Sequence, residues 1–181
     1  MILDLGTGDG RAVLKRAAMS ARALVIGLDP VAAAMAEASR RAARSANVLF
    51  VRGSAEAPPA ELVGRADEVT VLFPWGSLLR GVLGLQGAEA AADGMASLLR
   101  PGGRLTAMVS VTDRDGGVAP TDLDVAALTR LASVHAGRGL RLCDARPATP
   151  DEIRDSGSTW ARRLGATAGR RPAWRLEFER G

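Results

Sequence analysis

The stretch that decides the fold lies at residues 2–10 and reads Ile2-Leu3-Asp4-Leu5-Gly6-Thr7-Gly8-Asp9-Gly10. Its first four residues are apolar apart from Asp4 and predict a short buried strand. The three glycines allow the backbone to turn sharply and to approach a ligand closely before a helix begins near Arg11. A strand, a glycine loop and a helix in direct succession predict a nucleotide-type binding edge in an α/β sheet.

Outward from this stretch, short apolar runs alternate with alanine-rich helical stretches. We expect strands at residues 2–5, 23–28, 48–51, 68–73, 104–111, 140–145 and 174–179. We expect helices at residues 11–20, 30–45, 88–99 and 121–135, the third ended by Pro101-Gly102-Gly103 and the fourth capped by Thr121. Apolar strands separated by helices predict a parallel sheet covered on both faces, and the last strand follows a loop and is expected to run antiparallel. The prediction is one doubly wound α/β domain over residues 1–181, with a mostly parallel seven-stranded sheet.

The composition excludes several kinds of chemistry, because the chain has one histidine, one cysteine and no tyrosine. Cys143 has no partner for an internal disulfide, and with His135 it falls short of a closed zinc site, so we expect no metal centre. A serine–histidine–acid triad would have to use His135, which lies in ordinary helical surroundings. The apolar runs are too short to span a bilayer, and we expect a cytoplasmic monomer without a targeting segment.

The positive charge is concentrated near the end of the chain. The net charge is +4, and residues 138–181 hold ten arginines against six acids. Between Gly157 and Leu176 the charged residues are all arginines: Arg162, Arg163, Arg170, Arg171 and Arg175. One interpretation is a solvated face. The other is a phosphate-binding surface, since guanidinium groups match phosphate oxygens bidentately.

The glycine spacing separates two classes of cofactor site. A dinucleotide fingerprint places its third glycine at the position that Arg11 occupies here, so a nicotinamide oxidoreductase is disfavoured. The Asp-x-Gly-x-Gly-x-Gly form resembles motif I of class I S-adenosylmethionine (AdoMet) methyltransferases. AdoMet carries a sulfonium and an ammonium group rather than a pyrophosphate, so a carboxylate such as Asp4 suits its methionyl end. The alternative is a glycine turn with surface acids that bind nothing.

Two further acids follow strands where an AdoMet site needs them. Asp29 ends the second strand, a position from which it can accept hydrogen bonds from ribose hydroxyls. Ala55 and Glu56 follow the third strand, where such folds contact the adenine ring. The resemblance therefore implies AdoMet as cofactor, S-adenosylhomocysteine as product, and a cofactor-binding set of Asp4, Gly6, Gly8, Gly10, Asp29, Ala55, Glu56 and Leu72.

Two other segments point to a substrate. The first follows the fourth strand and reads Leu72-Phe73-Pro74-Trp75-Gly76-Ser77-Leu78-Leu79-Arg80-Gly81, and the second reads Ser158-Thr159-Trp160-Ala161-Arg162-Arg163-Leu164. Together with residues 4–10 they closely resemble the 16S rRNA adenine-N1 methyltransferases that confer aminoglycoside resistance. The resemblance runs from about Ile2 to Leu176. It implies the class I methyltransferase fold and methylation of adenine-1408 in the 30S subunit.

The residue types suit that reaction. A base inside an rRNA helix must be flipped out and held by stacking, and Trp75 and Trp160, both expected in loops, could sandwich it. Adenine N1 has its own lone pair, so methyl transfer needs no general base, and two indole faces suit the cationic product. The resemblance further implies that Ser77 and Ser158 line the pocket. It also implies that RNA is bound by Arg162, Arg163, Arg170 and Arg171, with Arg170 on a phosphate beside the flipped nucleotide.

The chain also departs from the family pattern. The family has a segment before motif I with a β-hairpin that helps docking on the 30S subunit, whereas the first strand here begins at residue 2. We expect this extension to be missing, either because the start codon is misassigned or because the chain is a short homologue with weak or no activity. Two other functions stay open: a small-molecule AdoMet methyltransferase with a closed apolar pocket, and a non-catalytic AdoMet- or RNA-binding relative.

Overall fold

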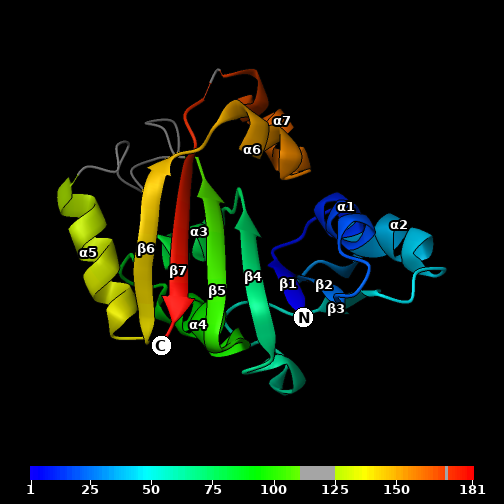
Figure 1. The fold of residues 1–181 in the computed structure, drawn as a ribbon, viewed down its shortest axis with the longest axis horizontal. Coiled ribbons are helices and arrows are strands. Elements are labelled where there is room, and N and C mark those ends of the chain that lie inside the picture. Colours follow the sequence, from blue (N-terminus) through cyan, green and yellow to red (C-terminus); the bar gives the residue numbers. More distant parts are fainter. Residues whose placement is uncertain (111–124, 170) are drawn as a thin grey trace.

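The central sheet of the computed structural model gives the chain its architecture (Figure 1). The structure describes residues 1–110, 125–169 and 171–181. In these residues seven strands form one sheet in the order β3-β2-β1-β4-β5-β7-β6. The strands are β1 (Ile2–Leu5), β2 (Val25–Asp29), β3 (Val48–Arg52), β4 (Ala66–Leu72), β5 (Leu99–Val109), β6 (Leu140–Pro147) and β7 (Trp174–Arg180).

The direction of the strands confirms the predicted fold class. The pairs β1–β2, β1–β4, β2–β3 and β4–β5 are parallel, whereas β7 runs antiparallel to both β5 and β6. Parallel strands all point their carboxyl ends to one edge of the sheet, and the strand order reverses between β1 and β4. Ligands of open α/β sheets bind in the crevice at such a switch point.

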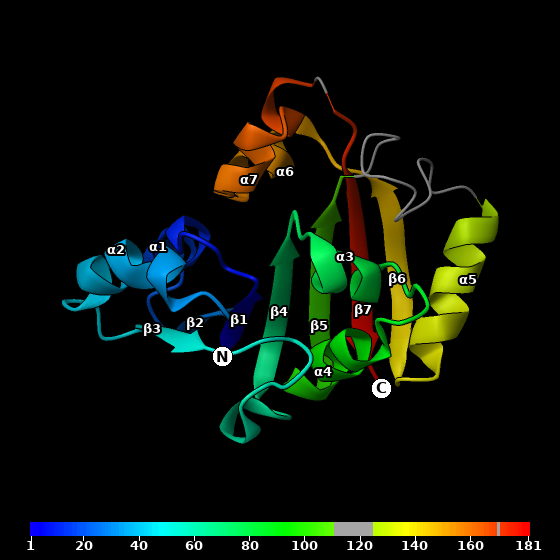
Figure 2. The same ribbon diagram turned by 180° about the vertical axis from the view of Figure 1, so that it is seen from behind.

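Helices cover both faces of this sheet. They are α1 (Arg11–Met19), α2 (Ala32–Ala42), α3 (Gly76–Val82), α4 (Glu89–Leu98), α5 (Val125–Ala136), α6 (Pro150–Asp155) and α7 (Thr159–Arg163), with 3-10 turns at Ala60–Leu62 and Ala166–Ala168. Figure 2 shows α3, α4 and α5 on one face, while α6 and α7 lie beyond the ends of β4 and β5. Within the described residues, no helix is long and apolar enough to cross a membrane.

The alternation of side chains along β1 explains why both faces are covered. Ile2 belongs to a buried cluster with Val13 of α1 and Ala42 of α2. Leu3 points to the opposite face and belongs to the main core, with Met95 of α4 and Leu131 of α5. Because successive residues of a strand face opposite sides, an uninterrupted apolar strand requires a core on each side.

The structure differs from the sequence prediction in three short helices, in the start of β5 and, by one to three residues, in several other element ends. Helices α3, α6 and α7 were not predicted, and the expectation that Trp160 lies in a loop is wrong because it lies in α7. The predicted helix at residues 88–99 ends at Leu98, and Leu99 already pairs with Ala66 in the sheet. The Pro101-Gly102-Gly103 turn is therefore an irregularity inside β5, after which pairing resumes at Arg104. The predicted cap, Thr121, lies outside the described residues.

His135 and Trp174 lie in or beside the core, whereas Cys143 does not. His135 is fully buried, its ring meets Phe178 edge-on at 4.8 Å, and its Nε2 atom lies 3.0 Å from the carbonyl oxygen of Val82. Burial lowers the pKa of His135, which favours the neutral ring. Trp174 is half-buried and packs against the main core, and Cys143 is exposed. His135 therefore serves packing.

Gly94 in α4 is where this helix touches the loop that follows β3. A Cβ atom at Gly94 would lie 1.6 Å from the carbonyl oxygen of Ala55 and 3.3 Å from Cδ of Pro58. No side chain fits at that distance. The helix therefore supports the Ala55–Glu56 segment directly through its backbone.

We expect Gly94→Ala to lower the free energy of unfolding by about 1–3 kcal/mol, because overpacking forces helix and loop apart. Helix propensity alone predicts the opposite, a gain of about 1 kcal/mol. Urea unfolding measures the difference. Gly137→Ala is the control, because its Cβ would meet its nearest neighbour, the Val134 carbonyl oxygen, at 3.6 Å; its effect should stay within about 0.5 kcal/mol. Unchanged stability of Gly94→Ala would contradict the close approach.

Candidate active site

The glycine loop between β1 and α1 forms the floor of the site. Gly6, Gly8 and Gly10 all have positive φ angles, of 73°, 57° and 71°. Such angles are strained for residues with a Cβ atom, so the loop needs glycine at these positions. The amide of Gly8 donates a hydrogen bond of 2.8 Å to Oδ2 of Asp29, and the amide of Val31 donates one of 2.8 Å to Oδ1 of Asp29. One carboxylate thus fixes the glycine loop and the turn after β2.

Asp4 is a buried acid directly beneath this loop, with 5% of its surface exposed. The hydroxyl of Thr70 donates a hydrogen bond of 2.8 Å to its Oδ1 atom. Burial raises the pKa of Asp4 to about 6, and hydrogen bonds from hydroxyl groups offset part of this rise. A buried carboxylate with a raised pKa is stabilised by a cation, so Asp4 favours a positively charged group in the site.

The turn after β4 holds Trp75 at the rim of the site. Phe73 has a φ of 52°, which is unusual for a bulky residue, and its side chain is buried. Its amide donates a hydrogen bond of 2.7 Å to the carbonyl oxygen of Met108 in β5. The buried ring and this hydrogen bond hold the strained turn, as strain at functional sites requires. Trp75 follows, precedes α3 and is 72% exposed.

The second tryptophan reaches the site from α7. Ser158 is the N-cap of this helix and accepts a hydrogen bond of 3.4 Å from the amide of Ala161. Trp160 is 38% exposed, and its indole Nε1 lies 3.9 Å from where a Cβ atom of Gly8 would stand. The guanidinium of Arg163 lies 5.3 Å from the centre of the Trp160 ring system, within the range of a cation–π contact.

These elements enclose two neighbouring cavities, of about 210 and 330 Å³. Both are lined by Gly6, Gly8, Asp29, Trp75 and Trp160. The smaller cavity adds three of the predicted site residues, which are Ala55, Glu56 and Ser77. The larger cavity adds four others, which are Asp4, Leu72, Ser158 and Arg163. The structure therefore brings most of the predicted cofactor and target-base residues to one place, while their individual roles stay predictions.

The remaining predicted residues lie elsewhere. Gly10 lines neither cavity, and a Cβ atom there would stand 2.6 Å from both Ala38 and Phe50, so its place is in the packing of the loop. Arg171 is half-buried and donates hydrogen bonds of 2.9 and 3.0 Å to the hydroxyl and carbonyl oxygens of Ser110. Arg162 is exposed on α7, and Arg170 lies outside the described residues.

Sequence reasoning missed the contacts that support the site. Glu56 accepts a short hydrogen bond from the Ser77 hydroxyl, and this bond lowers the pKa of Glu56. Val31, an exposed apolar residue, lines both cavities. The close approach of Gly94 to Ala55 has one signal in the sequence, which is the presence of a glycine inside the predicted helix at residues 88–99. Among the residues whose placement is described, no group of histidine, cysteine and acidic side chains could hold a metal ion.

Comparison with known proteins identifies the family. A family model described as 16S rRNA (adenine(1408)-N(1))-methyltransferase matches residues 1–177. A protein of that description from Streptoalloteichus tenebrarius is 35% identical over 176 residues, which are 91% of this chain and 80% of the relative. The chain belongs to this family. A methyltransferase of the same description from Streptoalloteichus hindustanus is 31% identical over 182 residues, covering 94% of this chain and 82% of its own.

Solved structures agree with this assignment. The 16S rRNA methyltransferase KamB superposes with a TM-score of 0.86 at 33% identity, covering 99% of this chain and 87% of its own. A second structure is a tryptophan-to-alanine variant of the 16S rRNA (adenine(1408)-N(1))-methyltransferase from Catenulisporales acidiphilia, solved with its cosubstrate SAM. It superposes with a TM-score of 0.86 at 30% identity, and the match covers 99% of this chain and 84% of that structure's chain. The predicted family, fold and AdoMet cofactor are thus confirmed, and a further solved structure of similar fold is that of the antibiotic-resistance methyltransferase Kmr.

The raised pKa of Asp4 predicts how AdoMet binding by this methyltransferase depends on pH. The cationic methionyl end of AdoMet favours the ionised carboxylate, so binding should weaken as Asp4 becomes protonated below pH 6. We expect the Kd for AdoMet to rise roughly tenfold from pH 7 to pH 5, measured by calorimetry. Asp4→Asn should bind weakly at both pH values.

A stability measurement separates this effect from acid unfolding. A folded-state pKa above the unfolded value lowers stability above pH 6 and releases that penalty as the pH falls toward 4. Asp4→Asn should therefore raise the Tm of the ligand-free protein at pH 7, and the gain should shrink toward pH 4. A Kd that stays constant between pH 7 and pH 5 would contradict the role of Asp4.

Proposed function

We propose that this chain methylates N1 of adenine-1408 of 16S rRNA within the 30S subunit, and that Trp75 and Trp160 hold the flipped base between them. The observation that carries the proposal is the pair of exposed tryptophans that both line the two cavities above the glycine loop. A small-molecule methyltransferase would enclose its substrate in an apolar pocket. An indole that is 72% exposed, as Trp75 is, favours a large external substrate instead.

The residues present fit the proposed cofactor. AdoMet supplies an electrophilic methyl group on a positively charged sulfur. Asp4 offers buried negative charge in the larger cavity, and Glu56 stays ionised in the smaller one because the Ser77 hydroxyl lowers its pKa. Asp29 still has lone pairs available beyond the two that its amide partners use. Carboxylates at both cavities therefore match a ligand with cationic and hydroxyl groups.

In the proposed reaction the protein has to position the two reactants, and it does not have to transfer a proton. The N1 lone pair of adenine is the nucleophile, so no side chain has to remove a proton, and the positive charge ends on the methylated base. Two indole faces stabilise such a cation, and stacking contributes about 1–3 kcal/mol per base. Holding two reactants in line is itself a large part of catalysis. This accounts for a site that lacks a histidine, cysteine or tyrosine among its lining residues.

Arginines near the tryptophans supply the contacts to RNA in this proposal. Arg162 and Arg163 are exposed on α7, next to Trp160. Arg170 is proposed for a phosphate beside the flipped nucleotide. Two donor groups of Arg171 are held by Ser110, so we assign it a weaker contact. Contacts to phosphate fix register and orientation but do not read sequence.

The proposal is tested by incubating purified 30S subunits with the protein and AdoMet and then reverse-transcribing the 16S rRNA. Methylation at N1 blocks the pairing edge, so a new stop is expected at adenine-1408. Reactions without AdoMet, and with Asp4→Asn at pH 7, serve as controls. If AdoMet binds and no stop forms on 30S subunits, the chain is a binding relative and not this enzyme.

The stacking model predicts the effect of removing either indole. Trp75→Ala and Trp160→Ala should each lower kcat/KM on 30S subunits by about 5- to 150-fold, the equivalent of 1–3 kcal/mol of stacking. The Kd for AdoMet should change by no more than a few-fold. Trp174→Phe is the matched control, because Trp174 packs against the core away from both cavities. A fully active variant at either position would show that the base is not held between two indoles.

A further inference from the structure

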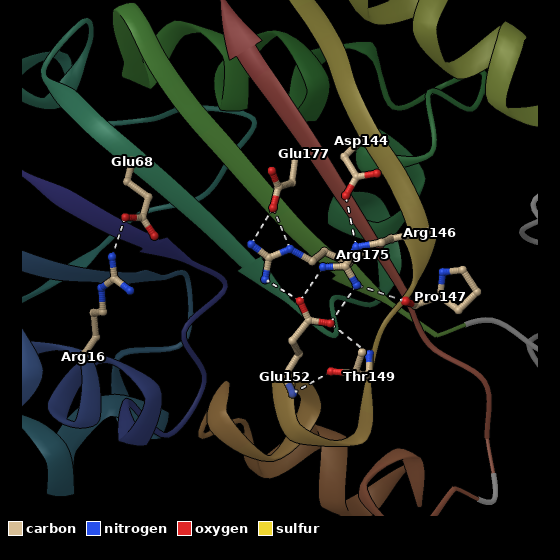
Figure 3. Close-up of polar contacts among 9 residues, drawn as sticks. All are labelled: Arg16, Glu68, Asp144, Arg146, Pro147, Thr149, Glu152, Arg175 and Glu177. Atoms are coloured by element: carbon tan, nitrogen blue, oxygen red, sulfur yellow. Dashed lines mark hydrogen bonds and ion pairs between the residues drawn. The ribbon is translucent and has the colours of Figure 1, made fainter.

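The residues 149–163, here named the α6–α7 arm, carry Trp160 over the site. The near end of the arm is fixed to the sheet by Glu152 in α6. Its carboxylate accepts hydrogen bonds of 2.8 and 2.5 Å from Arg146 of β6 and pairs with Arg175 of β7 at 3.4 Å (Figure 3). These contacts, led by Arg146, lower the pKa of Glu152 to about 2. Thr149 closes a capping box with Glu152, so α6 begins at a fixed place.

The far end of the arm meets the cofactor loop. The hydroxyl of Thr159 donates a hydrogen bond of 2.7 Å to Oδ2 of Asp9, across 150 positions of sequence, and the pair is partly buried. Asp9 lies between Gly8 and Gly10 of the glycine loop. Within the described residues, the one ion pair between the arm and α1 is Lys15–Asp155, which is exposed and 3.4 Å long. Exposed pairs of this kind contribute little.

Trp160 lies directly beside this far-end contact. It directly follows Thr159, and its indole edge rests on Gly8, whose amide is held by Asp29. Thr159 is the first residue of α7, a helix of only five residues that cannot hold its own position by helix formation alone. The fully buried Ala161 holds α7 in a core cluster with Phe73 and Met108, and the hydrogen bond to Asp9 ties the Trp160 end of the helix to the glycine loop.

From this geometry we infer that Thr159 and Asp9 are positioning residues that couple occupancy of the AdoMet site to capture of the target base. A cofactor that contacts the glycine loop restrains Asp9 further, and Asp9 through Thr159 restrains Trp160. Coupling of binding free energies is reciprocal, so a base stacked on Trp160 tightens the cofactor loop by the same factor. That the second ligand is an RNA base rests on the proposed function. The link between the two sites rests only on the Thr159–Asp9 hydrogen bond.

The strength of the Thr159–Asp9 hydrogen bond limits how strongly the cofactor site and the base site can be coupled. A hydrogen bond to a charged group contributes roughly 10- to 150-fold to an equilibrium constant. A part of it, about five- to tenfold, is expected to appear as coupling, since the bond exists before either ligand binds.

The experiment measures the Kd of 30S subunits for the protein without and with saturating S-adenosylhomocysteine, which permits binding without turnover. In the wild type, S-adenosylhomocysteine should tighten 30S binding about five- to tenfold. Thr159→Val keeps the shape of the side chain and removes the donor, so this factor should fall close to one. Thr159→Ser keeps the hydroxyl and should restore it. Asp151→Asn is the matched control, because it breaks the exposed Asp151–Arg154 pair of the same arm.

Hydrogen exchange gives a second readout that needs no ribosome. AdoMet should slow exchange in residues 158–164 of the wild type and of Thr159→Ser, but not of Thr159→Val, while residues 4–14 are protected in all three. Coupling that survives in Thr159→Val, or is lost equally in Thr159→Ser, overturns the inference. If the wild type does not bind 30S subunits, the proposed substrate is wrong, and the exchange measurement still decides on the link.

Discussion

The hydrogen bond from the Gly8 amide to the Asp29 carboxylate is the contact on which the site depends. It joins the loop after β1 to the end of β2, and the second oxygen of the same carboxylate fixes the turn that carries Val31. Three glycines with positive φ would otherwise leave the loop many conformations. With the loop fixed, both cavities have a floor, and Trp160 has a surface to rest on. The acid at the end of β2 is thus structural before any ligand arrives.

The negative and positive charges of this site come from different elements, which suits its two ligands. Buried negative charge at Asp4 costs stability in the ligand-free protein, as its raised pKa shows, and a cationic cofactor offsets that cost. The positive charge comes from α7, whose Arg163 lines the same cavity as Asp4. A cationic product would be repelled by such arginines if no aromatic face lay between them. Trp160, with Arg163 beside it, provides that face.

The sequence was sufficient for the elements whose structure is decided locally. The glycine spacing and the apolar runs predicted seven strands and the edge of the sheet where ligands bind. Helices α6 and α7 were missed because each has one or two turns and shows no periodicity. Their positions are set by Glu152 and Thr159, whose partners lie in other elements and, for Thr159, 150 residues away. The close approach of Gly94 to Ala55 is equally invisible, since no local pattern reports what packs on a glycine.

Counting the arginines of the tail overestimates the positive charge that is available to bind phosphate. Residues 138–181 carry the excess positive charge, which suggested a phosphate-binding surface. Arg175, however, lies between Glu152 and Glu177, and Arg146 is held by Glu152 and Asp144 (Figure 3).

A guanidinium already paired with a carboxylate releases few counterions on meeting RNA, so such arginines add little to the salt dependence of binding. The positive electrostatic potential at the proposed RNA-binding surface is therefore smaller than the net charge of the tail suggests. Arg162 and Arg163 are exposed on α7 and carry most of it among the described tail residues. Because they share a short helix with Trp160, attraction of the phosphate backbone and capture of the base act on the same element. A shift of α7 would alter both together.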